Sequence, residues 1–382
     1  MPLRSVSIVG TGQLPVEKQS AAPLRDLGVR ATRLAMQDAG VEKVDALFAG
    51  NMLSDELQGQ KHIATLIASE AGLYGIEALQ VRAATATGAA ALRMAYFAVA
   101  SGEAELAVAV GVEKMSAAPA TSALAKALDA EREVPTGATL ISRNAQLMSM
   151  YLDCYGVAYE SFVNFAINAH RNAATNPYAL FRKAVLREEV LESRIVNAPI
   201  RLFDCSPICD GAAAVVLAPA DAAREFADHP VRVLASAVAT DWLRIEDRPD
   251  PLAVAAARIS AHRAYERAGI SRSDVDFVEV HDAFSIMACL LLEAAGFAEQ
   301  GEGWRMAADG EIFREGRLPI ATLGGLKARG HPIGATALYQ TCEIVQQLTG
   351  CAGANQLPNA EIGMLQSVGG AAATVLTHLF AV

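Results

Sequence analysis

Residues 35–48, AMQDAGVEKVDALF, recur in outline at residues 264–280, AYERAGISRSDVDFVEV. Both stretches are typical of the end of an amphipathic helix, an Ala-Gly stop, a short turn and an apolar strand. Gly40 and Gly269 fall where a helix commonly ends in the left-handed conformation, which costs little only for glycine. A pattern that occurs twice in this way indicates an internal duplication.

A strand-like run precedes each copy, at residues 6–9 (VSIV) and at residues 231–238 (VRVLASAV). Strand, helix and strand in that order form a right-handed crossover connection. The chain is therefore predicted to be an α/β protein with a mainly parallel sheet.

A second pair of segments supports the duplication. Residues 85–96 (TATGAAALRMAY) and residues 330–339 (GHPIGATALY) each enter a helix after a glycine-containing loop. Small residues at a helix start let a backbone or a ligand approach its N-terminus. Close packing of two buried helices is the alternative explanation for each segment taken alone.

The repeat is interrupted between about residues 116 and 200, where helical patterns and more charge indicate an inserted subdomain. Residues 206–219 (SPICDGAAAVVLAP) then return to a strand. We expect an N-terminal half at residues 1–228, which contains the insertion, and a C-terminal half at residues 229–382.

The composition argues against some classes of function. Of 382 residues, 52% are hydrophobic and 6% aromatic, so the chain can bury a sizeable core of small side chains. The net charge of -10, from 32 Lys and Arg against 42 Asp and Glu, argues against nucleic-acid binding. A small ligand that carries phosphate needs only a few local cations or a helix N-terminus, so it remains compatible.

The six cysteines show no metal-ligand spacing, which predicts no metal site and reduced thiols. The first residues, MPLRSVSIVGTGQLP, meet glycine and proline too early for a signal peptide. No apolar run reaches about 18 residues without a charge, so we expect no membrane span and a cytoplasmic location.

Four segments carry a resemblance to a known family. They are, in order, residues 81–115 (VRAATATGAAALRMAYFAVASGEAELAVAVGVEKM), 204–218 (DCSPICDGAAAVVLA), 279–285 (EVHDAFS) and 324–337 (GGLKARGHPIGATA). Together with NPYALFRK in the insertion, they resemble the thiolase superfamily, above all its sterol-carrier-protein-2-type and archaeal branch. The resemblance implies a five-layer αβαβα thiolase fold and a homodimer formed through the N-terminal halves. It also implies an acyl-CoA substrate lying over the insertion, with no permanently bound cofactor.

The same resemblance assigns positions to the catalytic groups of a thiolase, and the thiols are missing. The nucleophilic cysteine, whose pKa the helix dipole and a nearby histidine would lower, corresponds to Thr85. The second thiol corresponds to Ser367 in the SVGG segment or to Ala283 in the HDAF segment.

The groups that stabilise an oxyanion are retained. His331 matches the residue that activates the nucleophile and also donates to a thioester oxygen, and His281 matches the residue that joins it there. The backbone N–H groups of Thr85 and Gly369 match a second oxyanion hole. Arg182 and Lys183 could contact the phosphates of CoA, and a solvated surface is the alternative role for both.

Structural roles compete with several of these assignments. A lone histidine is often structural, and the hydroxyl of Thr85 could bond to the backbone of its own helix terminus. Tyr151, Tyr155 and Tyr339 lie near the motifs, but the sequence does not place any of them as a base. Five cysteines are interpreted as small buried hydrophobic residues: Cys205, Cys209, Cys289, Cys342 and Cys351.

Retro-aldol cleavage of a 3-hydroxyacyl-CoA is the favoured hypothesis, because it requires an enolate site and no covalent intermediate. Thiolase-like aldolases work with a small DUF35-type partner, which this resemblance makes a candidate here. One alternative is an acyltransferase that uses Thr85 or groups supplied by a partner. Another is a catalytically silent CoA-binding subunit.

Overall fold

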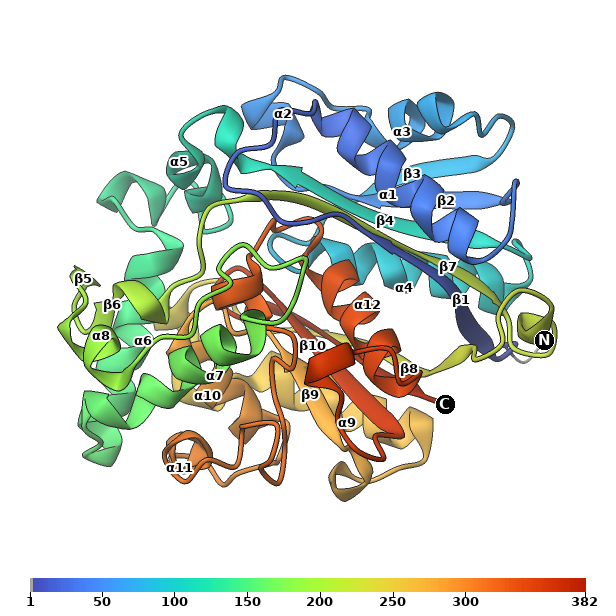
Figure 1. The fold of residues 1–382 in the computed structure, drawn as a ribbon. Helices are drawn as coiled ribbons and strands as arrows, with labels where there is room; N and C mark the ends of the chain where they lie inside the picture. Colours follow the sequence, from blue (N-terminus) through green and yellow to red (C-terminus); the bar gives the residue numbers. More distant parts are fainter. Residues whose placement is uncertain (1–2) are drawn as a thin grey trace.

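The computed structural model describes residues 3–382, which form five layers of helices and sheets (Figure 1). The first half follows the order strand, helix, strand twice over. Its elements are β1 (Val6–Gln13), α1 (Leu24–Asp38), β2 (Ala46–Gly50), α2 (Ser54–Leu57), α3 (Ile63–Ala71), β3 (Glu77–Val81), α4 (Thr87–Ser101), β4 (Ala107–Lys114) and, after the insertion, β7 (Asp210–Pro219).

The second half repeats this order without a counterpart of β3. Its elements are β8 (Val231–Thr240), α9 (Ala255–Ala268), β9 (Phe277–Val280), α10 (Ser285–Ala294), α11 (Gly303–Ala308), α12 (Thr336–Leu348), β10 (Ile362–Gly369) and β11 (Thr374–Ala381). Gly40 follows α1 with φ +65° and Gly269 ends α9 with φ +68°, so both glycines occupy the predicted left-handed positions.

The prediction of a mainly parallel sheet is wrong. Parallel pairing occurs between β2 and β3, between β2 and β4, and between β9 and β10. In the first half β7 lies between β4 and β1 and is antiparallel to both, and β11 lies in the same way between β10 and β8. Within each half, the strands that are joined through helices do run in the same direction. One strand of opposite direction lies between two of them, β7 in the first half and β11 in the second.

Three buried cores lie between the five layers, which confirms the predicted αβαβα arrangement. Successive strand residues point into different cores because side chains alternate across a sheet. Val108 of β4 packs in the core beneath α1 and α3, whereas Ala109 packs in the central core. In β10, Leu365 faces the central core and Met364 faces the core beside α9 and α10. Strands β1 and β8 pair through Ser7 with Arg232 and Ile8 with Val231, so the two halves share one nine-stranded sheet. Each half of this sheet is covered on both faces (Figure 1).

Helices α4 and α12 form the central layer and meet at their N-terminal ends. A Cβ atom on Gly88 would lie 2.8 Å from the carbonyl oxygen of Gly334, and one on Gly111 would lie 2.5 Å from it. The small residues at these helix starts therefore do allow close packing of two buried helices. The same packing brings the two preceding loops together.

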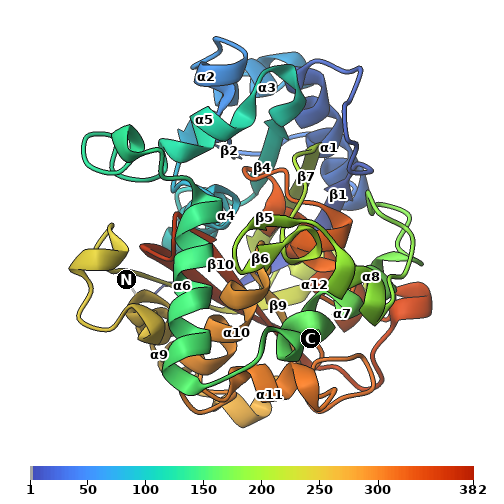
Figure 2. The ribbon, with the colours of Figure 1, turned by 90° about the vertical axis from the view of Figure 1, so that its left-hand side faces the viewer.

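The segment between β4 and β7 lies beside the layered halves, at the left of Figure 1. It contains α5 (Ala120–Ala125), α6 (Leu140–Tyr155), α7 (Val163–Ala173), α8 (Arg187–Glu192), β5 (Ile195–Asn197) and β6 (Ile200–Arg201). Helix α6 lies next to α10, and Leu147 and Tyr151 share a core with Ile286 and Leu290 (Figure 2). None of the helices in residues 3–382 combines the length and the apolar character that crossing a membrane requires.

Candidate active site

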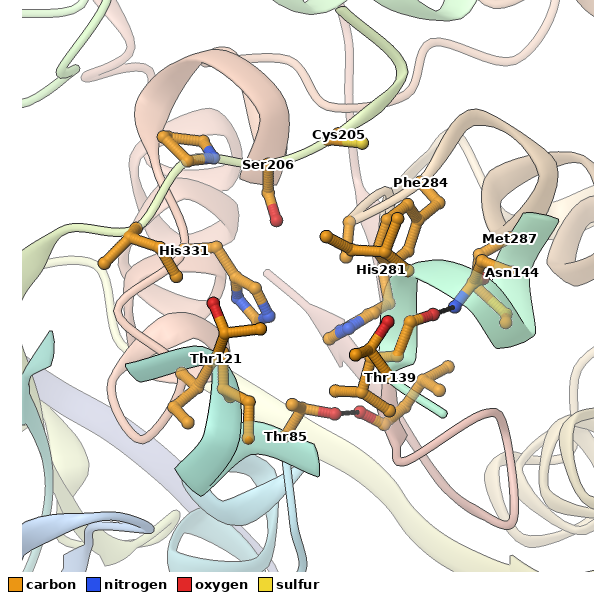
Figure 3. A pocket seen from close by; sticks show the side chains of 18 of the residues that line it. Thr85, Thr121, Thr139, Asn144, Cys205, Ser206, His281, Phe284, Met287 and His331 are labelled. Atoms are coloured by element: carbon orange, nitrogen blue, oxygen red, sulfur yellow. Dashed lines mark hydrogen bonds between the residues drawn. The ribbon is translucent and has the colours of Figure 1, made fainter. Parts of the chain in front are cut away.

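An open cavity of about 850 Å³ lies where the two halves and the insertion meet (Figure 3). Several of its residues directly follow strands of the two halves, at the carboxyl ends of those strands. Met115 follows β4, His281 follows β9, and Gly370 follows β10. In α/β folds ligands bind outside the carboxyl ends of such strands. The position of the cavity is thus a consequence of the topology.

The wall of the cavity is mostly apolar. Its apolar lining residues are Met115, Leu124, Leu140, Ile141, Pro207, Ile208, Ala283, Phe284, Met287, Ile333 and Val368. The polar side chains that line it are Thr85, Thr121, Thr139, Asn144, Cys205, Ser206, His281 and His331. An apolar cleft with a few convergent polar groups is typical of a site for a small molecule.

His281 and His331 approach each other across the cavity (Figure 3). Their ring centroids lie 5.1 Å apart, with the ring planes at 87°. Burial, together with Lys327 and Arg329, lowers the pKa of His281 to about 3. Burial, with His281 and Arg329 nearby, holds the pKa of His331 well below its usual value. Both rings are therefore neutral at pH 7.

Hydrogen bonds fix the position of the His331 ring. Its backbone N–H donates to the Sγ atom of Cys209 at 3.1 Å, and its Nδ1 atom lies 2.7 Å from the hydroxyl oxygen of Thr336. Thr336 is the first residue of α12. Helix α12 thus orients the ring and leaves the edge that carries Nε2 without a protein partner among residues 3–382.

Buried ion pairs support the loops that carry the two histidines. Arg329 donates to the Glu343 carboxylate at 2.9 Å and to the carbonyl oxygen of Gly330 at 2.6 Å. Lys327 donates to the carbonyl oxygen of Asp282 at 2.7 Å. Since these charges are buried, their pairing fixes the loops firmly, and removing one partner would be costly.

The hydroxyl of Thr85 bonds to the backbone, as one interpretation expected, but not to the backbone of its own helix terminus. Helix α4 begins two residues later, and Thr87 makes the local bonds instead. Thr85 donates to the carbonyl oxygen of Val368 at 2.6 Å, a residue at the end of β10 in the other half. The hydroxyl proton of Thr85 is therefore held by a backbone carbonyl.

The other positions assigned by resemblance lie at or near the cavity. Ala283 lines it, Ser367 is fully buried beside it, and Gly370 rather than Gly369 appears among its lining residues. Gly369 is buried against the first half, since a Cβ atom there would lie 2.6 Å from the carbonyl oxygen of Ala83. The glycine permits the close approach of β10 to the loop that carries Thr85.

The interpretation of five cysteines as buried hydrophobic residues is wrong for two of them. Cys351 is exposed, and Cys205 is partly exposed and lines the cavity. The Sγ atom of Cys205 lies 3.6 Å from the carbonyl oxygen of Arg201, and burial and Asp204 raise its pKa to about 12. A thiol with a raised pKa is a poor nucleophile at pH 7. Cys205 therefore does not replace a missing catalytic cysteine.

Arg182, Lys183 and the three tyrosines considered as bases lie outside the lining of the cavity. Arg182 and Lys183 are exposed, and Lys183 lies 3.6 Å from the Glu189 carboxylate. The hydroxyl of Tyr151 donates to Glu293 at 2.5 Å, and that of Tyr339 donates to the carbonyl oxygen of Leu14 at 2.7 Å. Both of these tyrosine hydroxyls therefore make buried hydrogen bonds in the core and do not face the cavity.

Sequence reasoning missed the polar side chains that the insertion and its neighbouring loop contribute. Thr121, Thr139, Asn144 and Ser206 line the cavity (Figure 3). Thr121, Thr139 and Asn144 belong to no recognisable motif, whereas Ser206 lies in the segment of residues 204–218 that carries the family resemblance. Asn144 lies on α6, so the packing of α6 on α10 brings it to the site. Within residues 3–382, no group of three or more His, Cys, Asp and Glu side chains is arranged to hold a metal ion.

A duplicated five-layer fold, with its cavity between the two central loops, defines the thiolase class of proteins. Residues 6–221 match the family Thiolase, N-terminal domain, and residues 237–381 match Thiolase C-terminal domain-like. The chain therefore belongs to the thiolase superfamily.

Its relatives confirm the resemblance to the archaeal and sterol-carrier-protein-2-type branch. An Acetyl-CoA acetyltransferase of Methanothermobacter thermautotrophicus is 43% identical over 381 residues, covering 99% of this chain and 100% of that protein. Sterol carrier protein 2 of Homo sapiens is 30% identical over 400 residues, covering 98% of this chain and 72% of that protein. The solved structure of the Ltp2-ChsH2(DUF35) aldolase has the same fold, with a TM-score of 0.86, 23% identity, and coverage of 98% and 97%.

Proposed function

We propose that the protein cleaves the Cα–Cβ bond of a 3-hydroxyacyl-CoA by retro-aldol chemistry, without a covalent intermediate. The hydrogen bond from Thr85 to the carbonyl oxygen of Val368 is the observation that carries this proposal. A nucleophile must give its proton to a base, whereas the hydroxyl of Thr85 donates its proton in a hydrogen bond to a backbone carbonyl. The two histidines face the cavity independently of Thr85.

The reaction needs one base and one oxyanion donor. The base takes the proton of the 3-hydroxyl, and the oxygen electron pair forms the carbonyl of a leaving ketone or aldehyde. The electrons of the Cα–Cβ bond then give a thioester enolate, which takes up a proton at Cα to leave a shortened acyl-CoA. A donor directed at the enolate oxygen lowers such a barrier by about 3–4 kcal/mol.

The apolar wall suits the acyl part of such a substrate. We propose that CoA enters over the insertion as part of the substrate and that no cofactor is bound permanently. Arg182 and Lys183 are exposed on the insertion, where cations can meet the phosphates of CoA.

Acyl transfer is the second candidate, because the relative that is 43% identical is an acetyltransferase by name. In that reaction Thr85 would have to release Val368, lose its proton to His331 and attack the 3-oxo carbon of a 3-oxoacyl-CoA. The acyl group would become an ester of Thr85, the Cα–Cβ bond would break, and the CoA enolate that leaves would take up the proton at Cα. A hydroxyl is a much weaker nucleophile than a thiol unless a strong base activates it.

We also propose two partners. One is a second copy of this chain, bound through β3, which lies at one end of the sheet and exposes Leu79 by 50%. An unpaired sheet edge favours pairing with another strand. The other is a small DUF35-type subunit, because the solved aldolase with the same fold is a complex with such a protein by name.

Product analysis separates the candidate reactions. The protein is incubated with 3-hydroxyacyl-CoA and 3-oxoacyl-CoA thioesters, with and without free CoA, and the products are followed by mass spectrometry. We expect a ketone or aldehyde from the hydroxyacyl series without free CoA, and an unmodified Thr85. An acyl adduct on Thr85, or chain shortening of the oxoacyl series only with free CoA, would establish acyl transfer instead. Binding of CoA thioesters without turnover, also after adding a DUF35-type subunit, would indicate a silent subunit.

A further inference from the structure

The hydroxyl of Thr336 makes two contacts and has one proton. It lies 2.7 Å from Nδ1 of His331, and it donates to the carbonyl oxygen of Pro332 at 3.1 Å. A carbonyl oxygen only accepts, so the bond to Pro332 uses the single proton of the hydroxyl. The Thr336 oxygen is then an acceptor toward His331.

We infer that Thr336 holds neutral His331 in the tautomer that carries its proton on Nδ1, so that Nε2 presents a lone pair to the cavity. The opposite tautomer would direct the hydroxyl proton to Nδ1 and set two oxygen lone pairs, those of Thr336 and Pro332, against each other at 3.1 Å. Only the Nδ1–H tautomer satisfies both short contacts. Thr336 is thus a positioning residue that makes His331 the base.

The first half of the molecule contains a similar arrangement, in which the group that donates to the threonine oxygen is a backbone N–H. Thr87, the first residue of α4, donates to the carbonyl oxygen of Ala84 at 2.6 Å and accepts the backbone N–H of Ala83 at 2.9 Å. Thr336 is likewise the first residue of α12. In the repeat-related position, then, a threonine hydroxyl donates backward to a loop carbonyl and accepts an N–H. The ring N–H of His331 replaces the backbone N–H of Ala83.

His281 has the complementary arrangement. Its Nδ1 atom is buried and has no hydrogen-bond partner among residues 3–382. A proton on Nδ1 would be left without an acceptor, which is unfavourable for a buried N–H group. A proton on Nε2 can instead be donated to a ligand in the cavity. The site therefore presents one acceptor, on His331, and one donor, on His281.

The acceptor on His331 and the donor on His281 distinguish two classes of substrate, a distinction that rests on the proposed function. A 3-hydroxyacyl thioester offers a hydroxyl donor to His331 and a thioester oxygen to His281. A 3-oxoacyl thioester offers two acceptors, one of which would face the lone pair of His331. Sites built to bond a substrate hydroxyl reject analogues that lack it, because a buried polar group stays unpaired.

Nitrogen NMR of the histidine rings tests the tautomer directly. The protein is labelled with 15N-histidine, and the His331 signals are assigned by their loss in His331→Gln. Thr336→Val removes the hydroxyl at nearly constant shape, and Thr336→Ser retains it as a matched control. We expect an unprotonated Nε2 in the wild type and in Thr336→Ser, and a shift toward protonated Nε2 in Thr336→Val. The same Val substitution should lower kcat on the 3-hydroxyacyl substrate about 10- to 100-fold, as does the loss of other groups that fix a histidine tautomer.

A protonated Nε2 in the wild type would overturn the inference, and so would an identical tautomer in Thr336→Val. The spectra need no substrate, so they also separate this inference from the proposed function. An unprotonated Nε2 in a protein that cleaves no hydroxyacyl-CoA would support the tautomer and count against the aldolase reaction.

Discussion

The loops that precede α4 and α12 occupy equivalent places in the two halves, but they are built differently. In the first loop Arg82 pairs with Asp55 near the surface, and Thr85 bonds to a backbone carbonyl. In the second loop Arg329 is fully buried with Glu343, and His331 keeps a ring edge free for the cavity. The first loop joins the halves, and the second one carries the groups that we assign to chemistry.

The strands beneath these loops show the same difference. In the repeat, Phe48 of β2 corresponds to Glu279 of β9, and both are buried. One Oε of Glu279 accepts from the backbone and hydroxyl of Thr322, at 2.8 and 2.7 Å. The two duplicated scaffolds thus differ at this position, where β2 buries an apolar side chain and β9 buries an ionisable one. Buried polar groups that are well paired rigidify their surroundings, which a positioned base requires.

Substitution of His331 in the second loop and of Thr85 in the first loop should give the largest difference in turnover. His331→Ala removes the base, and general bases contribute about 10²- to 10⁴-fold to turnover. Thr85→Val removes the hydroxyl but leaves both histidines, so we expect turnover of a 3-hydroxyacyl-CoA to fall less than about 10-fold, within the effect of one lost hydrogen bond. Steady-state kinetics on both variants make the comparison. Equal losses in the two variants would mean that Thr85 takes part in the chemistry.

The two arginines should differ in their contribution to folding. Arg329→Met leaves the Glu343 carboxylate buried without its partner, and breaking such a pair costs about 3–5 kcal/mol. Arg82→Met breaks a more exposed pair with two contacts of 3.0 Å, and exposed pairs are worth about 0–1 kcal/mol. Urea unfolding of both variants at one pH measures the two free energies. A similar small loss in both would show that the second loop is not stabilised by its buried charge.

The sequence predicted those parts of the fold that local patterns determine. The repeated helix and turn around Gly40 and Gly269 required only a helix period and a left-handed glycine. The antiparallel placement of β7 could not be inferred, because it follows from pairing with β4, about 100 residues away, and with β1, about 200 residues away.

The site divides in the same way between local motifs and distant contacts. His281 and His331 could be proposed as a pair because each lies in a motif of its own, and the structure brings them together. The bond from Thr85 to Val368 spans 283 positions of sequence and leaves no local signal. Likewise, Asn144 reaches the cavity only through the packing of α6.

A third contrast between the two halves lies in the pH dependence of stability. Burial and the nearby Glu343 raise the pKa of Glu279 from its usual value of 4.5 to about 8. Between these two pH values the unfolded chain releases the proton that the folded protein retains, so stability decreases as pH rises. The contribution is fully present below pH 4.5 and is lost once pH passes about 8.

Glu279→Gln should remove this part of the dependence, because glutamine keeps an oxygen for Thr322 and does not titrate. Unfolding free energies of the wild type and the variant, measured between pH 5 and pH 8.5, should converge toward low pH if the wild type is protonated there. Glu77→Gln, on the exposed strand β3, is the control and should follow the wild type. Parallel curves for Glu279→Gln and the wild type would mean that Glu279 is ionised in the folded state throughout. In that case the second half would bear a buried charge beneath His281, and the contrast with Phe48 would be one of charge rather than of polarity alone.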